Sequence, residues 1–89
     1  MSDNERTAGG LVHRFHLIMD AIGDLPENDV EHVEELVQVG EWQVALELLC
    51  TQVYEYEIKV DKELLKMIAA LGRDVGVQNR YWKVLGPEQ

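Results

Sequence analysis

Two histidines and an aspartate stand at a spacing that could serve metal chemistry. His13, His16 and Asp20 occupy positions i, i+3 and i+7, so a helix would bring them close together. A zinc site needs three or four ligands at a recognised spacing, and neither His32 nor Cys50 completes such a set. We therefore expect no metal ion and no cofactor.

The single cysteine and the many carboxylates are the other side chains that could react. Cys50 follows Leu49 and precedes Val53 on a mostly apolar surface, which predicts a packed thiol rather than a nucleophile with a histidine beside it. A hydrolase needs two differently tuned acids that meet in a cleft, whereas the acids here recur along helix faces. No glycine-rich phosphate-binding loop is present. We do not expect an enzyme.

The chain is strongly acidic, and most of its acids lie in one part of the sequence. Its 89 residues carry a formal net charge of −9. No lysine or arginine lies between Arg14 and Lys59, yet eleven acids do: Asp20, Asp24, Glu27, Asp29, Glu31, Glu34, Glu35, Glu41, Glu47, Glu55 and Glu57. Direct nucleic-acid binding is not expected, because it needs clustered cations. A basic protein partner would complement the charge of these acids. From charge alone, an acidic surface that only contacts solvent and keeps the protein soluble explains them equally well.

Length and composition predict one small domain. A chain of 89 residues can bury a single modest core, with a net stability of about 5 to 9 kcal/mol. No run approaches the roughly 18 apolar residues of a membrane span, and the polar start shows no signal-peptide pattern. One cysteine also fits a cytoplasmic protein. We expect a flexible tail at residues 1–10, a single helical domain at 11–86 and a disordered end at 87–89, with no membrane contact.

One long amphipathic stretch organises the rest of the chain. Apolar residues at 42, 45, 46, 49, 53 and 56 follow helical spacing, and Val44, Leu48 and Cys50 widen this buried stripe. The row that remains polar is narrow: Gln43, Glu47, Thr51 and Glu55. The pattern predicts a helix over residues 42–57 that contacts protein on nearly every side, with the other helices packed around it.

The remaining elements are also predicted to be helices, at about residues 11–22, 26–39, 61–75 and 79–85. Glycines 23, 40 and 76 end the first three of these, and Asp61 and Asn79 cap the last two. The second begins either with Pro26 in its first position or with a capping box at Asn28. Residues 54–60 alternate as in a strand, but the chain offers no partner strand, so residues 58–60 are predicted to be an extended connection. The fold class is an all-α compact bundle of four helices plus a short C-terminal helix.

The aromatic residues divide into core and surface candidates. Trp42 is predicted to be core. Tyr54 and Tyr56 stand two apart on the predicted helix and cannot face the same way, so one of them should be exposed beside Glu55 and Glu57. A tyrosine among acids suits an interface with a basic partner, and a tyrosine at the edge of the core is an equally good interpretation.

The sequence resembles a known protein family, and the resemblance suggests a function. The residues that carry it are Leu36-Val37, Gly40-Glu41-Trp42, Ala45-Leu46-Glu47, Leu49-Cys50, Gln52, Tyr54-Glu55-Tyr56 and Leu71-Gly72. With these motifs, the chain resembles the small MafI-type immunity proteins of bacterial polymorphic-toxin systems over about residues 26–85. The resemblance implies a cytoplasmic protein that neutralises a cognate toxin by binding its C-terminal toxic domain, often a nuclease. It assigns no toxin-contact residues.

Exposed acids and tyrosines form the predicted partner-binding surface. We expect it to comprise Glu27, Glu31, Glu34, Glu35, Tyr54, Glu55, Tyr56 and Glu57. The competing hypothesis is a small acidic helical adaptor or regulatory module that binds another basic protein. The sequence leaves the oligomeric state open.

Overall fold

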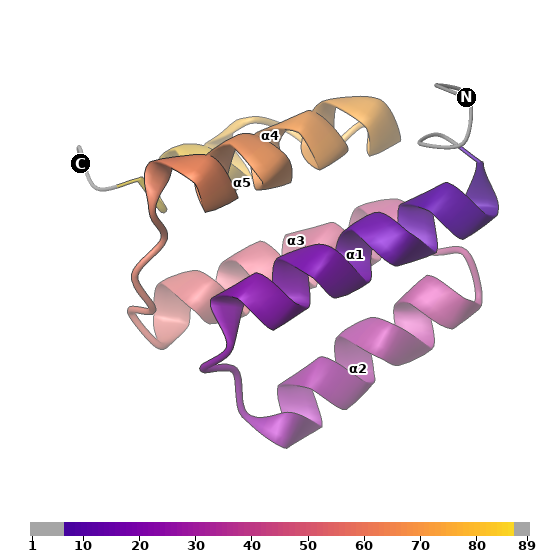
Figure 1. Cartoon of the computed structure of the whole chain (residues 1–89), viewed down its shortest axis with the longest axis horizontal. Helices are drawn as coiled ribbons and strands as arrows, with labels where there is room; N and C mark the ends of the chain where they lie inside the picture. The colour runs from indigo at the N-terminus through magenta and orange to yellow at the C-terminus, as the bar shows by residue number, and fades with distance from the viewer. Residues whose placement is uncertain (1–6, 87–89) are drawn as a thin grey trace.

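The computed structural model describes residues 7–86, and within them the chain forms helices and no strand. The helices are α1 (Ala8–Ile22), α2 (Glu27–Gln38), α3 (Trp42–Glu55), α4 (Lys62–Val75) and α5 (Arg80–Lys83). α4 and α5 lie on one side of α1 and α3, and α2 lies on the other (Figure 1). This arrangement confirms the predicted all-α bundle of four helices with a short C-terminal helix. None of the described helices combines the length and apolar character needed to cross a membrane.

The first helix begins earlier than predicted. Thr7 is its N-cap, and the Thr7 hydroxyl accepts a hydrogen bond of 3.1 Å from the Gly10 N–H. Gly9 and Gly10, which suggested a flexible tail, therefore belong to the first turn of α1, because the threonine cap compensates for their poor helix propensity. Residues 1–6 of the expected tail, and the expected disordered end at 87–89, lie outside the described residues.

The ends of the helices follow the predicted glycines. Gly23, Gly40 and Gly76 have φ values of 74°, 79° and 86°, the left-handed conformation that glycine adopts without strain. After α2, the Gly40 N–H donates to the Val37 carbonyl (3.1 Å) and the Glu41 N–H to the Leu36 carbonyl (2.9 Å), which is a Schellman motif. The resulting tight turn makes α2 and α3 adjacent antiparallel helices, as predicted.

The caps predicted at the starts of the helices are confirmed only in part. Asp61 caps α4, because its carboxylate accepts a hydrogen bond of 2.8 Å from the Leu64 N–H. Pro26 is the N-cap of α2 rather than its first residue, and Asn28 lies inside the helix, so the capping box is not used. Asn79 occupies the N-cap position of α5 but its side chain makes no capping hydrogen bond.

The core is shared between α3 and α1. α3 contacts α2, α4 and α5, and it buries Ala45, Leu46, Leu49, Cys50 and Val53. α1 buries an equal number of residues against α2 and α4: Leu11, Phe15, Ile18, Met19 and Ile22. Trp42 is only partly buried and stacks on Phe15, with 6.3 Å between the ring centroids. Val44 was predicted to widen the buried stripe of α3, but it is 46% exposed, so that stripe is narrower than expected.

Gly72 in α4 allows α5 to pack closely against that helix. Gly72 is buried on α4, and a Cβ atom placed there would overlap the ring of Trp82 in α5. The indole therefore packs directly on the helix backbone. Because Trp82 is itself 7% exposed, the ring has little room to move away.

Gly72→Ala is expected to lower the free energy of unfolding by about 1 to 2 kcal/mol. Overpacking costs about 1 to 3 kcal/mol, and the overlap of the new Cβ with the buried Trp82 ring puts this substitution in the upper part of that range. The better helix propensity of alanine returns about 1 kcal/mol. Urea unfolding measures the difference. The matched control is Gly9→Ala, because a Cβ there meets nothing within 4 Å and should leave the protein slightly more stable. If Gly72→Ala also stabilises, Trp82 does not pack on α4 as described.

Candidate functional site

The acids of α2 project from the outer side of that helix. Val33 and Val37 are buried and hold α2 on the bundle, which directs Glu27, Glu31 and Glu35 into solvent. No described residue forms a salt bridge with these three glutamates. Glu34 differs, because it is partly buried and its Oε2 lies 3.6 Å from Nε2 of His16 in α1. The α2 part of the predicted surface therefore contains three exposed acids and one that faces a histidine.

The end of α3 exposes both tyrosines, where the sequence predicted one. Tyr54 is 56% exposed and Tyr56 is 48% exposed. The reason is that α3 ends at Glu55, two residues earlier than predicted. Tyr56 therefore lies in the following turn, where helix geometry no longer directs its side chain away from that of Tyr54. Glu55 and Glu57 are exposed as well.

Asp29 joins the start of α2 to the end of α3. The Tyr56 hydroxyl donates a hydrogen bond of 2.7 Å to Oδ2 of Asp29, and the Gln52 amide donates one of 2.7 Å to Oδ1. Asp29 is thus the point where α2 meets the end of α3. We use the name acidic face for the acids of α2 together with the residues at the end of α3: Glu27, Asp29, Glu31, Glu34, Glu35, Tyr54, Glu55, Tyr56 and Glu57. The role of Asp29 could not be predicted from the sequence, because these contacts join residues 23 and 27 positions apart, and periodicity gives no signal over such separations.

These hydrogen bonds change how both partners titrate. The hydrogen bond from Tyr56, followed by that from Gln52, lowers the pKa of Asp29 from its usual 3.8. The same Tyr56–Asp29 hydrogen bond raises the pKa of Tyr56 above its usual 10.0. A depressed carboxyl pKa stabilises the fold at pH values above the unfolded-state pKa, and this contribution is lost as pH falls through the folded-state pKa.

Tyr56→Phe is therefore expected to raise the pKa of Asp29 toward 3.8. The loss of the strongest hydrogen bond to the charged carboxylate is the reason. Carboxyl NMR titration of both proteins measures the shift. Tyr54→Phe is the control, because within the described residues the Tyr54 hydroxyl donates no hydrogen bond to Asp29, and this variant should leave the Asp29 pKa where it is. Equal pKa values in Tyr56→Phe and wild type would contradict the hydrogen bond.

The residues considered for catalysis or metal binding do not come together. Cys50 is 1% exposed, and burial, with a smaller effect of Glu47, raises its pKa to about 12. The thiol is therefore protonated at neutral pH and is a poor nucleophile. Across residues 7–86, no three His, Cys, Asp or Glu side chains are arranged so that they could hold a metal ion.

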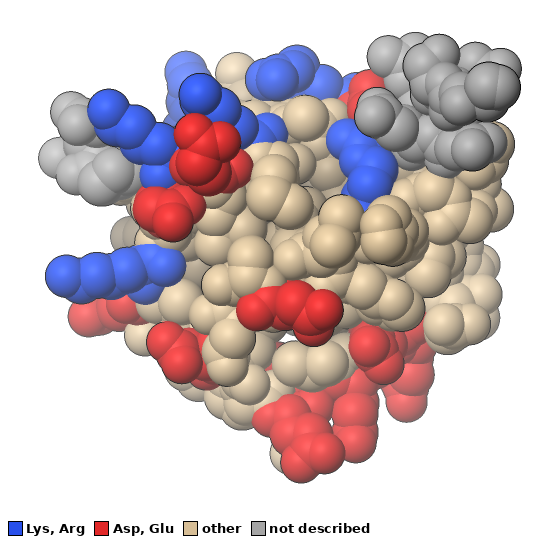
Figure 2. Space-filling view, viewed as in Figure 1, with Lys and Arg blue, Asp and Glu red and all other residues tan. Residues whose placement is uncertain are grey.

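Charge is divided between the two sides of the molecule. Residues 8–57 contain one cation, Arg14, and eleven acids, a net charge of −10. Residues 58–86 contain six cations (Lys59, Lys62, Lys66, Arg73, Arg80 and Lys83) and three acids (Asp61, Glu63 and Asp74), a net charge of +3. Because α4 and α5 form one side of the bundle, acidic side chains gather over α2 and basic ones over α4 (Figure 2).

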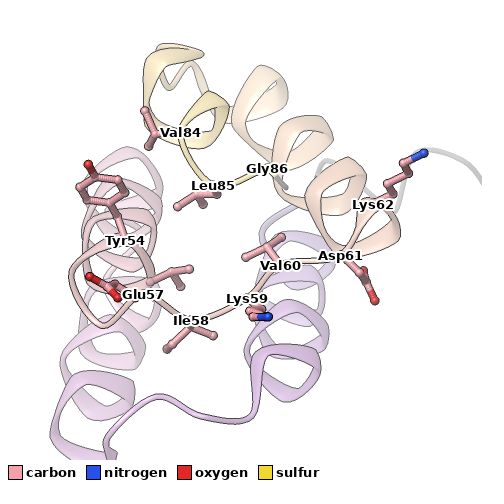
Figure 3. A pocket seen from close by; sticks show the side chains of 11 residues that line it. Tyr54, Glu57, Ile58, Lys59, Val60, Asp61, Lys62, Val84, Leu85 and Gly86 are labelled. Carbon is pink, nitrogen blue, oxygen red and sulfur yellow. The ribbon is translucent and has the colours of Figure 1, made fainter. Parts of the chain in front are cut away.

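An apolar groove of about 690 Å³ adjoins the acidic face. It lies where the chain leaves α3 for α4 and where the segment after α5 returns (Figure 3). Val53, Val60 and Leu85 form its buried apolar lining, and the exposed side chains of Tyr54 and Val84 stand at its edge. This groove has no signal in the sequence, because it forms between segments far apart in the chain.

Comparison with models of known protein families, with curated proteins and with solved structures finds no match.

Proposed function

We propose that this protein is a cytoplasmic immunity protein that binds a cognate bacterial toxin domain and neutralises it without chemistry of its own. The observation that carries the proposal is the acidic face. Glu27, Glu31 and Glu35 are exposed and form no salt bridge with any described residue, and the start of the same helix is hydrogen-bonded through Asp29 to the exposed Tyr56.

A basic partner would explain why α2 exposes so many unpaired acids. Like charges three and four apart on a helix destabilise it by a few tenths of a kcal/mol per pair, and α2 has no lysine or arginine to offset this cost. Exposed acids speed association with a cationic protein, and tyrosines supply rigid contact area. A nuclease, whose cleft must attract nucleic acid, is a partner of the required charge. The resemblance to MafI-type immunity proteins points to the same class of partner.

The direct test starts from the gene beside this protein's gene, which the proposal expects to encode a toxin-like domain. The two purified proteins are expected to form a stable one-to-one complex, and cells that express the toxin domain are expected to survive when they also express this protein. Surface-binding kinetics and a survival assay measure the two results. If wild type neither binds nor protects, the immunity proposal fails. A signalling or transcription gene in place of the toxin gene would favour the adaptor hypothesis.

A further inference from the structure

Two apolar side chains are exposed at the turn between α2 and α3. Val39 is 72% exposed, the highest fraction among the large apolar side chains of residues 7–86, and Val44 is 46% exposed. The tight turn at Gly40 lies between them, so both valines stand at the same end of the α2–α3 hairpin. Single exposed apolar side chains are common on protein surfaces, whereas neighbouring ones mark a surface that contacts another molecule.

Two partly buried leucines continue this apolar surface along the hairpin. Leu36 precedes Val39 by three positions on α2, and Leu48 follows Val44 by four positions on α3. This spacing places each leucine on the same side of its helix as the valine. Because α2 and α3 are antiparallel neighbours (Figure 1), the two leucines stand across from each other farther from the turn. We call these four residues the hairpin strip.

The charged residues that border the hairpin strip are all acidic. α2 and α3 contain no lysine or arginine. The exposed Glu35 lies one helical turn before Val39, and the exposed Glu41 lies in the turn itself. The rim of the apolar groove differs, because acids and lysines are mixed there and their charges cancel. The hairpin strip therefore combines exposed apolar area with a border of one sign.

This border decides which kind of partner the hairpin strip can accept. A second copy of this chain would bring its own acids against these acids, and such a contact between like charges is unfavourable. An anionic membrane surface is disfavoured for the same reason. A protein with apolar side chains inside a basic surface fits both features, because the valines lose contact with water while the acids gain cations.

We propose that the hairpin strip is where the toxin domain is held, and this inference rests on the proposed function. Apolar side chains of the toxin domain pack on Val39 and Val44, and its lysines or arginines pair with Glu35 and Glu41 around them. The acids then govern how fast the two proteins meet, and the hairpin strip governs how slowly they separate. The partner-binding surface thus extends past the acidic face to the α2–α3 turn.

Replacing both valines with serine tests the hairpin strip without changing any charge. Val39 and Val44 are exposed, so the double variant Val39→Ser/Val44→Ser should fold. It is expected to dissociate from the toxin domain about tenfold faster than wild type or more, because apolar contacts are lost, with an association rate within about twofold of wild type. Surface-binding kinetics measure both rates, and urea unfolding verifies the fold.

Leu17→Ser/Val84→Ser is the matched control. Leu17 on α1 is 45% exposed and Val84 at the end of α5 is 43% exposed, so this variant also removes two exposed apolar side chains and no charge. Neither residue belongs to the hairpin, and both rates should stay at their wild-type values. Equal acceleration of dissociation in the two double variants would overturn the proposal.

Methyl NMR detects the contact directly. In the complex, a dissolved paramagnetic agent is expected to relax the methyl groups of Val39 and Val44 at least about fivefold less than in the free protein, because the toxin domain covers them. Equal relaxation in the complex and in the free protein would contradict the contact. Methyl groups that are already shielded in the free protein would contradict it too, because a second copy would then occupy the hairpin strip.

The outcomes separate this inference from the proposed function. If wild type binds and protects, yet Val39→Ser/Val44→Ser dissociates at the wild-type rate, the hairpin-strip proposal is wrong and the immunity proposal stands. If wild type does not bind the toxin domain, both proposals fall. Should the double variant unfold, the methyl measurement on the wild-type complex decides the question.

Discussion

Replacing Glu31 and Glu35 with lysine is expected to slow association with the proposed toxin partner by one to three decades. Both side chains are exposed, stand one helical turn apart on α2 and form no salt bridge within the described residues. Exposed charges act mainly on the rate of encounter, so the dissociation rate should change less. The melting temperature should be nearly unchanged, because neither side chain packs in the core. Glu34 is a poorer choice, since its reversal would also disturb His16.

Surface-binding kinetics at several salt concentrations measure this effect. Added salt should slow wild type more than the double variant, because screening removes an attraction that the variant no longer has. The single variant Glu31→Lys is measured alongside, with Glu63→Lys as its control, since each changes the net charge equally. Glu63 lies on α4, away from the acidic face, and its contact with Lys66, at 3.8 Å, is between highly exposed side chains. If the double variant associates and protects as well as wild type, the acidic face serves solubility and our interface is wrong.

Leu49→Ala is expected to lower the free energy of unfolding by about 2 to 5 kcal/mol. Leu49 is 0% exposed on α3, the helix that contacts α2, α4 and α5, so its truncation leaves a cavity that several elements surround. For a domain of this size the total stability is about 5 to 9 kcal/mol, and the variant could lose half of it.

Urea unfolding provides the measurement, and Val44→Ala is the matched control. Val44 lies on the same helix but is 46% exposed, so its truncation should cost no more than about 0.5 kcal/mol. A cost below about 1 kcal/mol for Leu49→Ala would mean that α3 does not form the centre of the core.

The fold could be predicted because its signals are local. Apolar spacing located the helices, and Asp61, Gly40 and Gly76 marked their ends through hydrogen bonds made within a few residues. The start of α1 was placed too late because two glycines obscured the cap at Thr7. The residue at which a helix ends also decides which way the following side chains face. Because α3 ends at Glu55, Tyr56 lies in a turn, and the prediction that one of the two tyrosines is exposed was wrong, since both are.

The candidate site could be predicted only in part, because it depends on contacts between distant residues. The acids and tyrosines were identifiable by type and exposure. The hydrogen bonds that join Asp29 to Tyr56 and Gln52, and the packing of Trp82 on Gly72, are set by the way the helices meet. Neither has a signature in periodicity or composition.

The division of charge between the α2 side and the α4 side gives the molecule a permanent electric dipole moment. In the field of a cationic partner, such a dipole experiences a torque while the two proteins are still separated by solvent. Rotational diffusion is then biased, so that the α2 side turns toward the partner before the surfaces touch and fewer collisions occur in unproductive orientations. Net charge alone would attract the partner equally to any face, whereas the dipole also selects the face that arrives first.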